Sequence, residues 1–321
     1  MPENNERKKD FLRSLNELSA DGIRAKKKKK RRVVDTVLDK ARFLIMGVCV
    51  VVFAFSLYSI GKSMADYDEQ NRVYDAIGDF VMDENGVGMM FADQNLQATP
   101  DHDNALTMSK DDLSDYTNAQ VVNKEYARVR VKLLNLKSRY PNLYGWITVS
   151  GTNINYPIMQ ANDNDYYLNH SYNGSMLGAG AIFADFTCQP KLMQNKNLVV
   201  YGHHMSNSSM FHQLDNFLKE SFFMNNGKVI VYTLDGMYTY RIYSIYETHK
   251  YYPYITTYFS NDEKFIEFAE TSEQKSIYRK GKVHFDGNSK LLTLSTCNNR
   301  FSEGRLAVHA VMVDVYNNPN S

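Results

Sequence analysis

A cysteine and an arginine stand close together near the C-terminal end of the chain, in the stretch LLTLSTCNNRFSEGRLAVHA at 291–310. A cysteine attacks carbonyl groups as its thiolate, and a neighbouring guanidinium favours the thiolate over the thiol. The same guanidinium can donate hydrogen bonds to a carbonyl oxygen that becomes an oxyanion. Cys297 and Arg305 therefore suggest acyl transfer. The alternative is that Cys297 only packs in the structure and that Arg305 is a surface charge. This stretch by itself favours that alternative.

A cysteine nucleophile also needs a proton partner, which is usually a histidine. The chain has eight histidines, and His203 stands out because it follows the strongly apolar run NLVVYG. Gly202 would let the backbone turn sharply there, so that the imidazole lies at a strand end. His204 and His309 remain alternatives, the first as its neighbour and the second because it shares a strand face with Arg305.

These side chains depend on two strands that join at a short loop. In a strand, successive side chains alternate between faces, so Leu292 and Leu294 mark the core side and Cys297 projects from the opposite one. If NNRFSEG forms a hairpin loop, Cys297 and Arg305 face one another across the ladder.

The surrounding sequence predicts a mainly β domain. Short apolar runs, bounded by Gly, Asn, Asp and Pro, recur between Asn123 and the C-terminus; they include YGWITVSG, NINYPIMQ, AGAIFADF, KVIVYTLDG and MYTYRIYSIYET. Seven or eight such strands suggest an antiparallel barrel or sandwich. Helical spacing of apolar residues over 129–140, closed by Pro141, predicts a helix before the strands. A second helix-like insert spans 260–280.

The N-terminal part of the chain predicts a membrane anchor. Residues 43–60 carry no charge and are just long enough to cross a bilayer as a helix. Residues 1–42 carry 14 Lys/Arg against 7 Asp/Glu, a net charge of +7. The positive-inside rule then keeps the N-terminus in the cytoplasm and the rest outside. Two alternatives, a cleaved signal peptide and a nucleic-acid-binding basic patch, fit less well, because the cytoplasmic head is long and an apolar span follows directly.

Four regions follow from this pattern: a basic cytoplasmic tail (1–42), a transmembrane anchor (43–60), an acidic extracellular stalk (61–122) and a catalytic domain (123–321). Within the stalk, residues 66–120 carry 13 acidic against 2 basic side chains, a net charge of −11. No stretch has the spacing of an EF-hand calcium loop. The outside part holds two cysteines, Cys188 and Cys297, and a disulfide between them would block the thiol.

Taken in order, the motifs resemble the sortases, membrane-anchored cysteine transpeptidases of Gram-positive bacteria. The resemblance covers about 123–316 and rests on YGHHM, TLSTC and GRLAVHA, together with GWITVSGTNINYPIMQ, DNDYYL and GAIFADF. It implies a closed eight-stranded sortase-type β-barrel. The N-terminal helix and the insert at about 260–280 resemble class B sortases rather than class A.

Residue by residue, the resemblance makes Cys297 the nucleophile, His203 the general acid and base, and Arg305 the residue that stabilises the oxyanion. Ser295 and Thr296 are expected to line the substrate groove. The implied reaction cleaves a C-terminal sorting signal, LPxTG-like or NPxTN-like, after its Thr. A thioester then passes the secreted protein to an amine, either of the peptidoglycan cross-bridge or of a pilin lysine.

The resemblance implies no metal and no other cofactor, and no nucleic-acid partner. Two further hypotheses of other classes remain: a cysteine protease with water as the acceptor, and a non-catalytic surface binding module that keeps the barrel. The identity of the products with and without an amine distinguishes all three.

Overall fold

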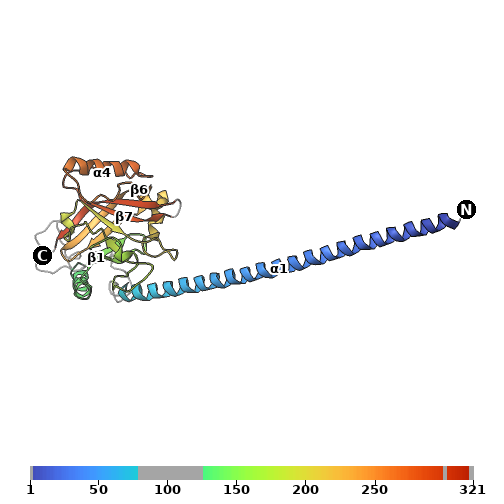
Figure 1. Cartoon of the computed structure of the whole chain (residues 1–321). Helices are drawn as coiled ribbons and strands as arrows, with labels where there is room; N and C mark the ends of the chain where they lie inside the picture. The colour runs from blue at the N-terminus through green and yellow to red at the C-terminus, as the bar shows by residue number, and fades with distance from the viewer. Residues whose placement is uncertain (1–2, 79–125, 299–301, 318–321) are drawn as a thin grey trace, which may run out of the picture. The chain divides into compact units, whose positions relative to one another are not determined.

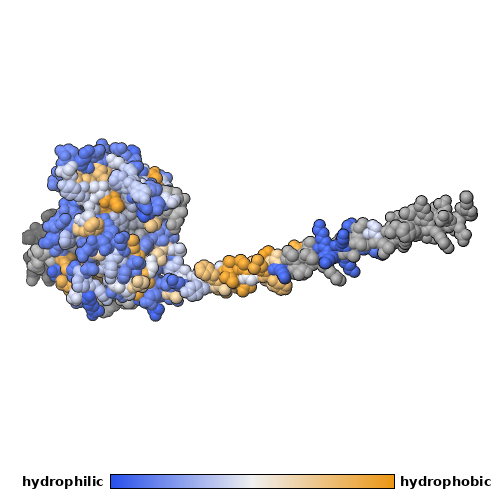
Figure 2. Space-filling model, viewed as in Figure 1, coloured by the Kyte–Doolittle hydropathy of each residue, from blue (hydrophilic) through white to orange (hydrophobic). Residues whose placement is uncertain are grey.

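The computed structural model describes residues 3–78, 126–298 and 302–317, and the chain divides into two compact units, Met1–Ala65 and Asp66–Ser321. The first unit is helical from Glu3 and belongs to α1 (Glu3–Gly78). Within α1, Lys40–Tyr74 is long and apolar enough to cross a membrane. Figure 2 shows this apolar band along the helix, and the side chains of 43–60 pack against no core. A membrane-spanning helix is therefore consistent with the structure, as the sequence predicted.

The second unit is built on a closed eight-stranded barrel, which confirms the predicted fold. Around the barrel the strands follow the order β1-β2-β3-β4-β7-β8-β6-β5. Figure 1 labels β1, β6 and β7 of this barrel. Their bounds are β1 Leu143–Val149, β2 Asn155–Met159, β3 Ile182–Ala184, β4 Asn197–Tyr201, β5 Lys228–Tyr232, β6 Gly236–His249, β7 Leu291–Asn298 and β8 Gly304–Asn317.

The expectation of a wholly antiparallel arrangement is wrong at two junctions. Strand β3 runs parallel to β2, and β7 runs parallel to β4. Parallel neighbours require a long crossover connection. Residues 160–181 connect β2 to β3, and the connection from β4 to β7 contains β5, β6 and several helices. The crossover between β4 and β7 places the ends of these two strands side by side, although they are distant in sequence.

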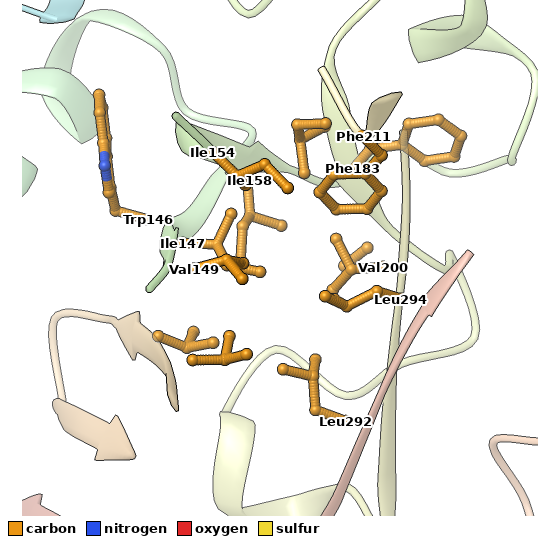
Figure 3. Close-up of a cluster of buried hydrophobic side chains, with 14 of the residues drawn as sticks. Trp146, Ile147, Val149, Ile154, Ile158, Phe183, Val200, Phe211, Leu292 and Leu294 are labelled. Carbon is orange, nitrogen blue, oxygen red and sulfur yellow. The ribbon is translucent and has the colours of Figure 1, made fainter. Parts of the chain in front are cut away.

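The barrel interior is filled by branched and aromatic side chains. Figure 3 shows Ile147, Ile158, Val200 and Leu294, from four different strands, converging on this interior, and all are fully buried. Burying one such side chain contributes roughly 1.5–3 kcal/mol. The period-two assignment of the leucine face is thus confirmed.

The opposite face of β7 is also buried, because a second layer covers it. Thr293 is fully buried, and its hydroxyl contacts the ring of His309 on β8. Helix α4 (Asp262–Lys275) packs over β6, and its Phe265 and Ala269 form a separate small core with Tyr243. Strand β7 therefore lies between the barrel interior on one face and the layer that contains α4 on the other. Cys297, near the end of β7, is partly exposed.

The predicted helices are present. Residues 126–139 are helical, with Val129, Leu133 and Leu136 buried on one face, and the insert at 260–280 contains α4. Asn261 caps α4, because its side chain accepts a hydrogen bond from the backbone N–H of Lys264. Shorter helices complete the unit: η1 Tyr166–Leu168, η2 Leu192–Gln194, η3 His212–Leu218 and α3 Glu220–Asn225.

The second unit includes the C-terminal end of α1, which was expected to be part of a solvated stalk. Tyr74 and Ile77 are buried, and the Tyr74 hydroxyl donates to the backbone carbonyl of Gly180 at 2.7 Å. The side chain of Gln70 hydrogen-bonds the hydroxyl of Ser209. This compact unit begins at Asp66. The four predicted regions, with a boundary at 123, stay a prediction. Stalk residues 79–122 lie outside the described residues.

Candidate active site

Cys297 lies near the end of β7, directly opposite Arg305. The two residues are partners in the antiparallel β7–β8 ladder, next to the pair of Asn298 and Gly304 where the ladder ends. The predicted juxtaposition across the hairpin is therefore confirmed. Cys297 is a free thiol and is partly exposed, as is Arg305. A guanidinium at this position can stabilise a thiolate and, in a later step, an oxyanion.

His203 reaches the same place from β4. The N–H of Gly202 donates to the carbonyl of Ser295 at 3.1 Å, which extends the parallel β4–β7 pairing by one step and brings His203 to the end of β7. Gly202 is needed for close packing rather than for a sharp turn. A Cβ atom there would collide with Ile182 and lie 2.7 Å from the ring of Phe211.

The imidazole of His203 is held by one backbone contact. Its Nε2 lies 2.6 Å from the carbonyl oxygen of Leu168 in η1. A carbonyl oxygen can only accept a hydrogen bond, so Nε2 carries a proton. The Nδ1 atom is then the ring nitrogen that can take up or release a proton.

The two alternative histidines are engaged elsewhere. His204 pairs with the carboxylate of Asp215 at 2.9 Å, away from the thiol. His309 is fully buried between Tyr246 and Thr293, and burial lowers its pKa to about 3. Of the histidines that the structure describes, only His203 lines the cavity next to Cys297.

The three predicted catalytic side chains share one cavity of about 330 Å³. It opens at the barrel end where β4, β7 and β8 meet. Its walls are mostly apolar and aromatic, with a few polar groups at the thiol, as is typical of sites that bind peptides or small ligands. The lining residues are Asn164, Leu168, Phe183, Tyr201, Gly202, His203, Lys250, Tyr251, Tyr254, Ile255, Ser295, Thr296, Cys297 and Arg305.

Ser295 and Thr296 line this cavity but are buried, with exposed fractions of 3% and 2% respectively. The Ser295 hydroxyl lies 2.7 Å from that of Tyr254, and the Thr296 hydroxyl is buried without a hydrogen-bond partner in the described structure. Ser295 is therefore a support for Tyr254 as well as a wall of the cavity. A substrate-binding role for the pair stays a prediction.

Tyr254 is a cavity residue that the sequence reading missed. Burial raises the pKa of its phenol; the hydrogen bond with Ser295 and the charge of Arg305 oppose this shift, and Cys297 adds to it. The phenol thus lies within electrostatic reach of both Cys297 and Arg305. The aromatic run YYPYITTY that follows β6 was the available signal, because such a run between two elements is unusual for a solvated loop.

Charged residues flank Arg305 at the mouth of the cavity. Lys250 forms an ion pair with Glu303 at 2.8 Å, and its amine lies 5.0 Å from the centre of the Tyr251 ring. The Arg305 guanidinium donates to the carbonyl of Gly304 at 2.8 Å. Among the described residues this guanidinium has no other hydrogen-bond partner, so its remaining donors can serve a carbonyl group in the cavity.

Cys188 takes no part in this site. Its thiol is free and buried, 4.0 Å from the carbonyl oxygen of Asn197, and burial raises its pKa to about 12. Cys297 is also free, so the two are not joined in this structure. Among the residues that the structure describes, no cluster of three or more His, Cys, Asp or Glu side chains could hold a metal ion.

Comparisons with a family model and with known proteins all indicate the same family. Residues 147–313 match the model of the sortase domain. Sortase B of Listeria monocytogenes is 32% identical over 200 residues, which cover 62% of this chain and 80% of that protein. Sortase B of Staphylococcus aureus is also 32% identical, over 197 residues, and the match covers 61% of this chain and 80% of that protein.

Solved structures agree. Sortase B of Clostridium perfringens is 37% identical, with a TM-score of 0.54, and the match covers 56% of this chain and 98% of that one. A complex of Staphylococcus aureus sortase B with substrate is 29% identical, with a TM-score of 0.53, over 63% of this chain and 99% of that one. The chain therefore belongs to the sortase family and is a sortase B-like cysteine transpeptidase.

Proposed function

We propose that Cys297, His203 and Arg305 carry the transpeptidase reaction of this chain. The observation that carries the proposal is their convergence in one cavity, with Cys297 directly opposite Arg305 in the β7–β8 ladder. Each residue comes from a different strand end, so the arrangement depends on the closed barrel. The family membership of residues 147–313 supports a common reaction class.

The reaction divides into two acyl transfers. The Cys297 thiolate attacks the Thr carbonyl carbon of the substrate, and a C–S bond forms while Arg305 donates hydrogen bonds to the oxyanion. The C–N bond then breaks, and protonated His203 gives its proton to the leaving amine. An incoming amine attacks the thioester carbonyl carbon and gives a proton to His203, a new C–N bond forms as the C–S bond breaks, and Cys297 leaves as the thiolate.

The substrates in this proposal are secreted proteins that carry a C-terminal sorting signal, LPxTG-like or NPxTN-like. The related Staphylococcus aureus sortase B has been solved with a substrate, which supports a peptide in the corresponding cavity here. The acceptor is an amine of the peptidoglycan cross-bridge or a pilin lysine. Phe183, Tyr251 and Ile255 line this cavity, and such apolar and aromatic lining suits a peptide with apolar side chains.

The proposed location is the cell membrane, with a single span at 43–60, the N-terminus in the cytoplasm and the catalytic unit outside. The support is the apolar helix together with the basic residues that precede it. A membrane anchor would hold the enzyme where secreted substrates emerge.

The test incubates the full chain, in lipid nanodiscs, with LPxTG-like and NPxTN-like peptides, each with and without a free amine, and identifies products by mass. We expect an acyl-enzyme at Cys297 and a transpeptidation product that requires the amine. Hydrolysis unaffected by the amine would instead indicate a cysteine protease.

Cys297→Ala should abolish the acyl-enzyme and every product. Cys188→Ala is the matched control, because this thiol is buried outside the cavity, and it should leave turnover unchanged. Turnover that survives in Cys297→Ala would refute the assignment of the nucleophile. A wild-type chain that binds both peptides but acylates with neither would indicate a binding module.

A further inference from the structure

A second cavity, larger than the catalytic one, is lined by four basic side chains and by no acidic one. Its volume is about 950 Å³, and the four are Lys228, Arg241, Arg279 and Lys280. It lies over the first residue of β5, the middle of β6, the β1–β2 turn at 150–151 and the segment after α4. None of its lining residues lines the catalytic cavity.

Two of these cations are forced against one another by strand pairing. Lys228 and Arg241 are direct partners in the antiparallel β5–β6 ladder, and both side chains are exposed on the same face. Like charges directly opposite each other destabilise a sheet. A pair of this kind is expected to cost stability unless a negative charge is bound between them.

Lys280 brings a third positive charge to the same place. Its amine hydrogen-bonds the carbonyl of Asn226 and lies 5.0 Å from the centre of the Phe223 ring, so it is held there. Burial lowers the pKa of Lys280, and the charge of Arg241 lowers it further. Gly227 keeps the wall open, because a Cβ atom there would lie 3.2 Å from the amine.

No carboxylate of the described structure neutralises this group. None of the four basic side chains forms an ion pair with a described residue, and Asp314, which pairs with Thr239 on β6, does not line the cavity. Two guanidinium forks and two amines suit phosphate oxygens, because an arginine can bind two of them at once. The cavity volume of about 950 Å³ favours a ligand with more than one phosphate group over a single small anion.

We infer that this basic cavity is a binding site for a phosphate-bearing polyanion, separate from the catalytic centre. The ligand bridges the Lys228–Arg241 pair and reaches Arg279. Two sources share this chemistry, a soluble polyphosphate and the headgroups of anionic phospholipids. The site acts by charge neutralisation, so binding weakens as salt rises.

The test measures the binding of inorganic tripolyphosphate to the full chain in phosphatidylcholine nanodiscs by calorimetry, together with the Tm. We expect binding by the wild type and a rise in its Tm. Arg241→Gln/Arg279→Gln should bind about tenfold more weakly or worse, because it loses two charge-assisted contacts. Its Tm without ligand should be no lower than that of the wild type, since a repulsive charge is removed.

Arg128→Gln/Lys191→Gln is the matched control, because it removes two exposed charges that lie outside the cavity. It should bind tripolyphosphate as the wild type does. Equal affinity in the two double variants, or no binding by the wild type, would overturn the proposal. A lower affinity of the wild type for tripolyphosphate in phosphatidylglycerol nanodiscs would identify the lipid headgroup as the source, and an unchanged affinity would identify a soluble one.

Discussion

At the scale of single residues, the catalytic cavity depends on side chains whose backbone positions are fixed by pairing. Cys297 and Arg305 are partners in one ladder, and His203 follows a strand that pairs with β7. The Nε2 atom of the His203 imidazole hydrogen-bonds the carbonyl of Leu168, so Nδ1 is the nitrogen that can face a substrate. The chemistry proposed for these residues therefore depends on geometry that neighbouring strands supply.

Arg305→Lys should reduce kcat/KM by about 100-fold or more. A lysine keeps the positive charge but cannot offer the planar fork that donates two hydrogen bonds to one oxyanion. Steady-state transpeptidation of an LPxTG-like or NPxTN-like peptide measures the effect. Lys250→Arg, at the mouth of the same cavity, keeps its charge and its pairing with Glu303 and should change kcat/KM far less. Equal losses in the two variants would contradict a specific role for the guanidinium of Arg305.

Because of His309, the free energy of unfolding should decrease as the pH is lowered through the acid range. Burial lowers its pKa from 6.5 to about 3. As the pH falls below about 6.5, His309 becomes protonated in the unfolded chain but stays neutral in the folded chain. The free energy of unfolding therefore decreases from pH 6.5 down to about 3, where the folded state also becomes protonated. Denaturant unfolding across this range measures the slope.

His309→Gln should be less stable at neutral pH, because the bonds with Thr293 and Tyr246 are altered. Its stability should nevertheless vary less with pH between 6.5 and 3 than that of the wild type. His170→Gln, on a partly exposed histidine whose Nδ1 lies 2.8 Å from the carbonyl oxygen of Tyr166, is the control and should leave the slope unchanged. Parallel pH profiles for wild type and His309→Gln would show that this residue does not account for the slope.

At the scale of elements, the site is where strands from distant parts of the chain end together. Strand β4 reaches β7 across a crossover that contains β5, β6 and α4, and this pairing is parallel. Helix α4 and the aromatic residues after β6 cover the outer face of β7 and β8. Cys297 lies near the end of β7, beyond this covering layer, and is therefore partly exposed.

Gly202→Ala should lower both stability and activity. The added Cβ would collide with Ile182 and the ring of Phe211, and the resulting shift would move His203 away from the cavity. Overpacking of this kind typically costs about 1–3 kcal/mol. Gly178→Ala is the matched control, because a Cβ atom there would meet nothing within 4 Å. The free energy of unfolding and kcat are the measurements, and an active, stable Gly202→Ala variant would contradict this packing argument.

At the scale of the whole molecule, the catalytic unit extends into the helix that carries the apolar span. Residues 66–78 pack on the barrel through Gln70, Tyr74 and Ile77. Tyr74 donates to Gly180, in the loop that also holds Leu168, and Gln70 contacts Ser209, in the loop that follows His203. The end of the helix thus contacts the loop whose Leu168 holds the imidazole of His203 and also the loop that follows His203.

A chain that begins at Asp66 should keep the Tm of its catalytic unit, and one that begins at 79 should unfold at a lower temperature. The shorter chain loses the buried Tyr74 and Ile77 and leaves the Gly180 carbonyl without its donor. Losing one such side chain costs about 2–5 kcal/mol. Thermal unfolding of both chains measures the difference, and Tyr74→Phe, which removes only the hydroxyl, should fall between them. Equal Tm values would show that 66–78 contribute nothing.

Much of this protein follows from its sequence, because the controlling interactions are local. Alternation along LLTLSTC set the leucine face, turn residues divided the strands, and an uncharged run of the length of a bilayer predicted the apolar helix. The short loop between Cys297 and Arg305 made their pairing predictable, since a hairpin joins strands that are neighbours in sequence.

Long-range packing decided the rest. Nothing local indicates that β4 pairs with β7, that a second layer buries the outer face of β7, or that α1 ends against the barrel. The partnerships of His309 and of Tyr254 follow from that packing, and so does the approach of Lys280 to Arg241. These contacts join residues far apart in the chain, and only closure of the barrel brings them within reach of one another.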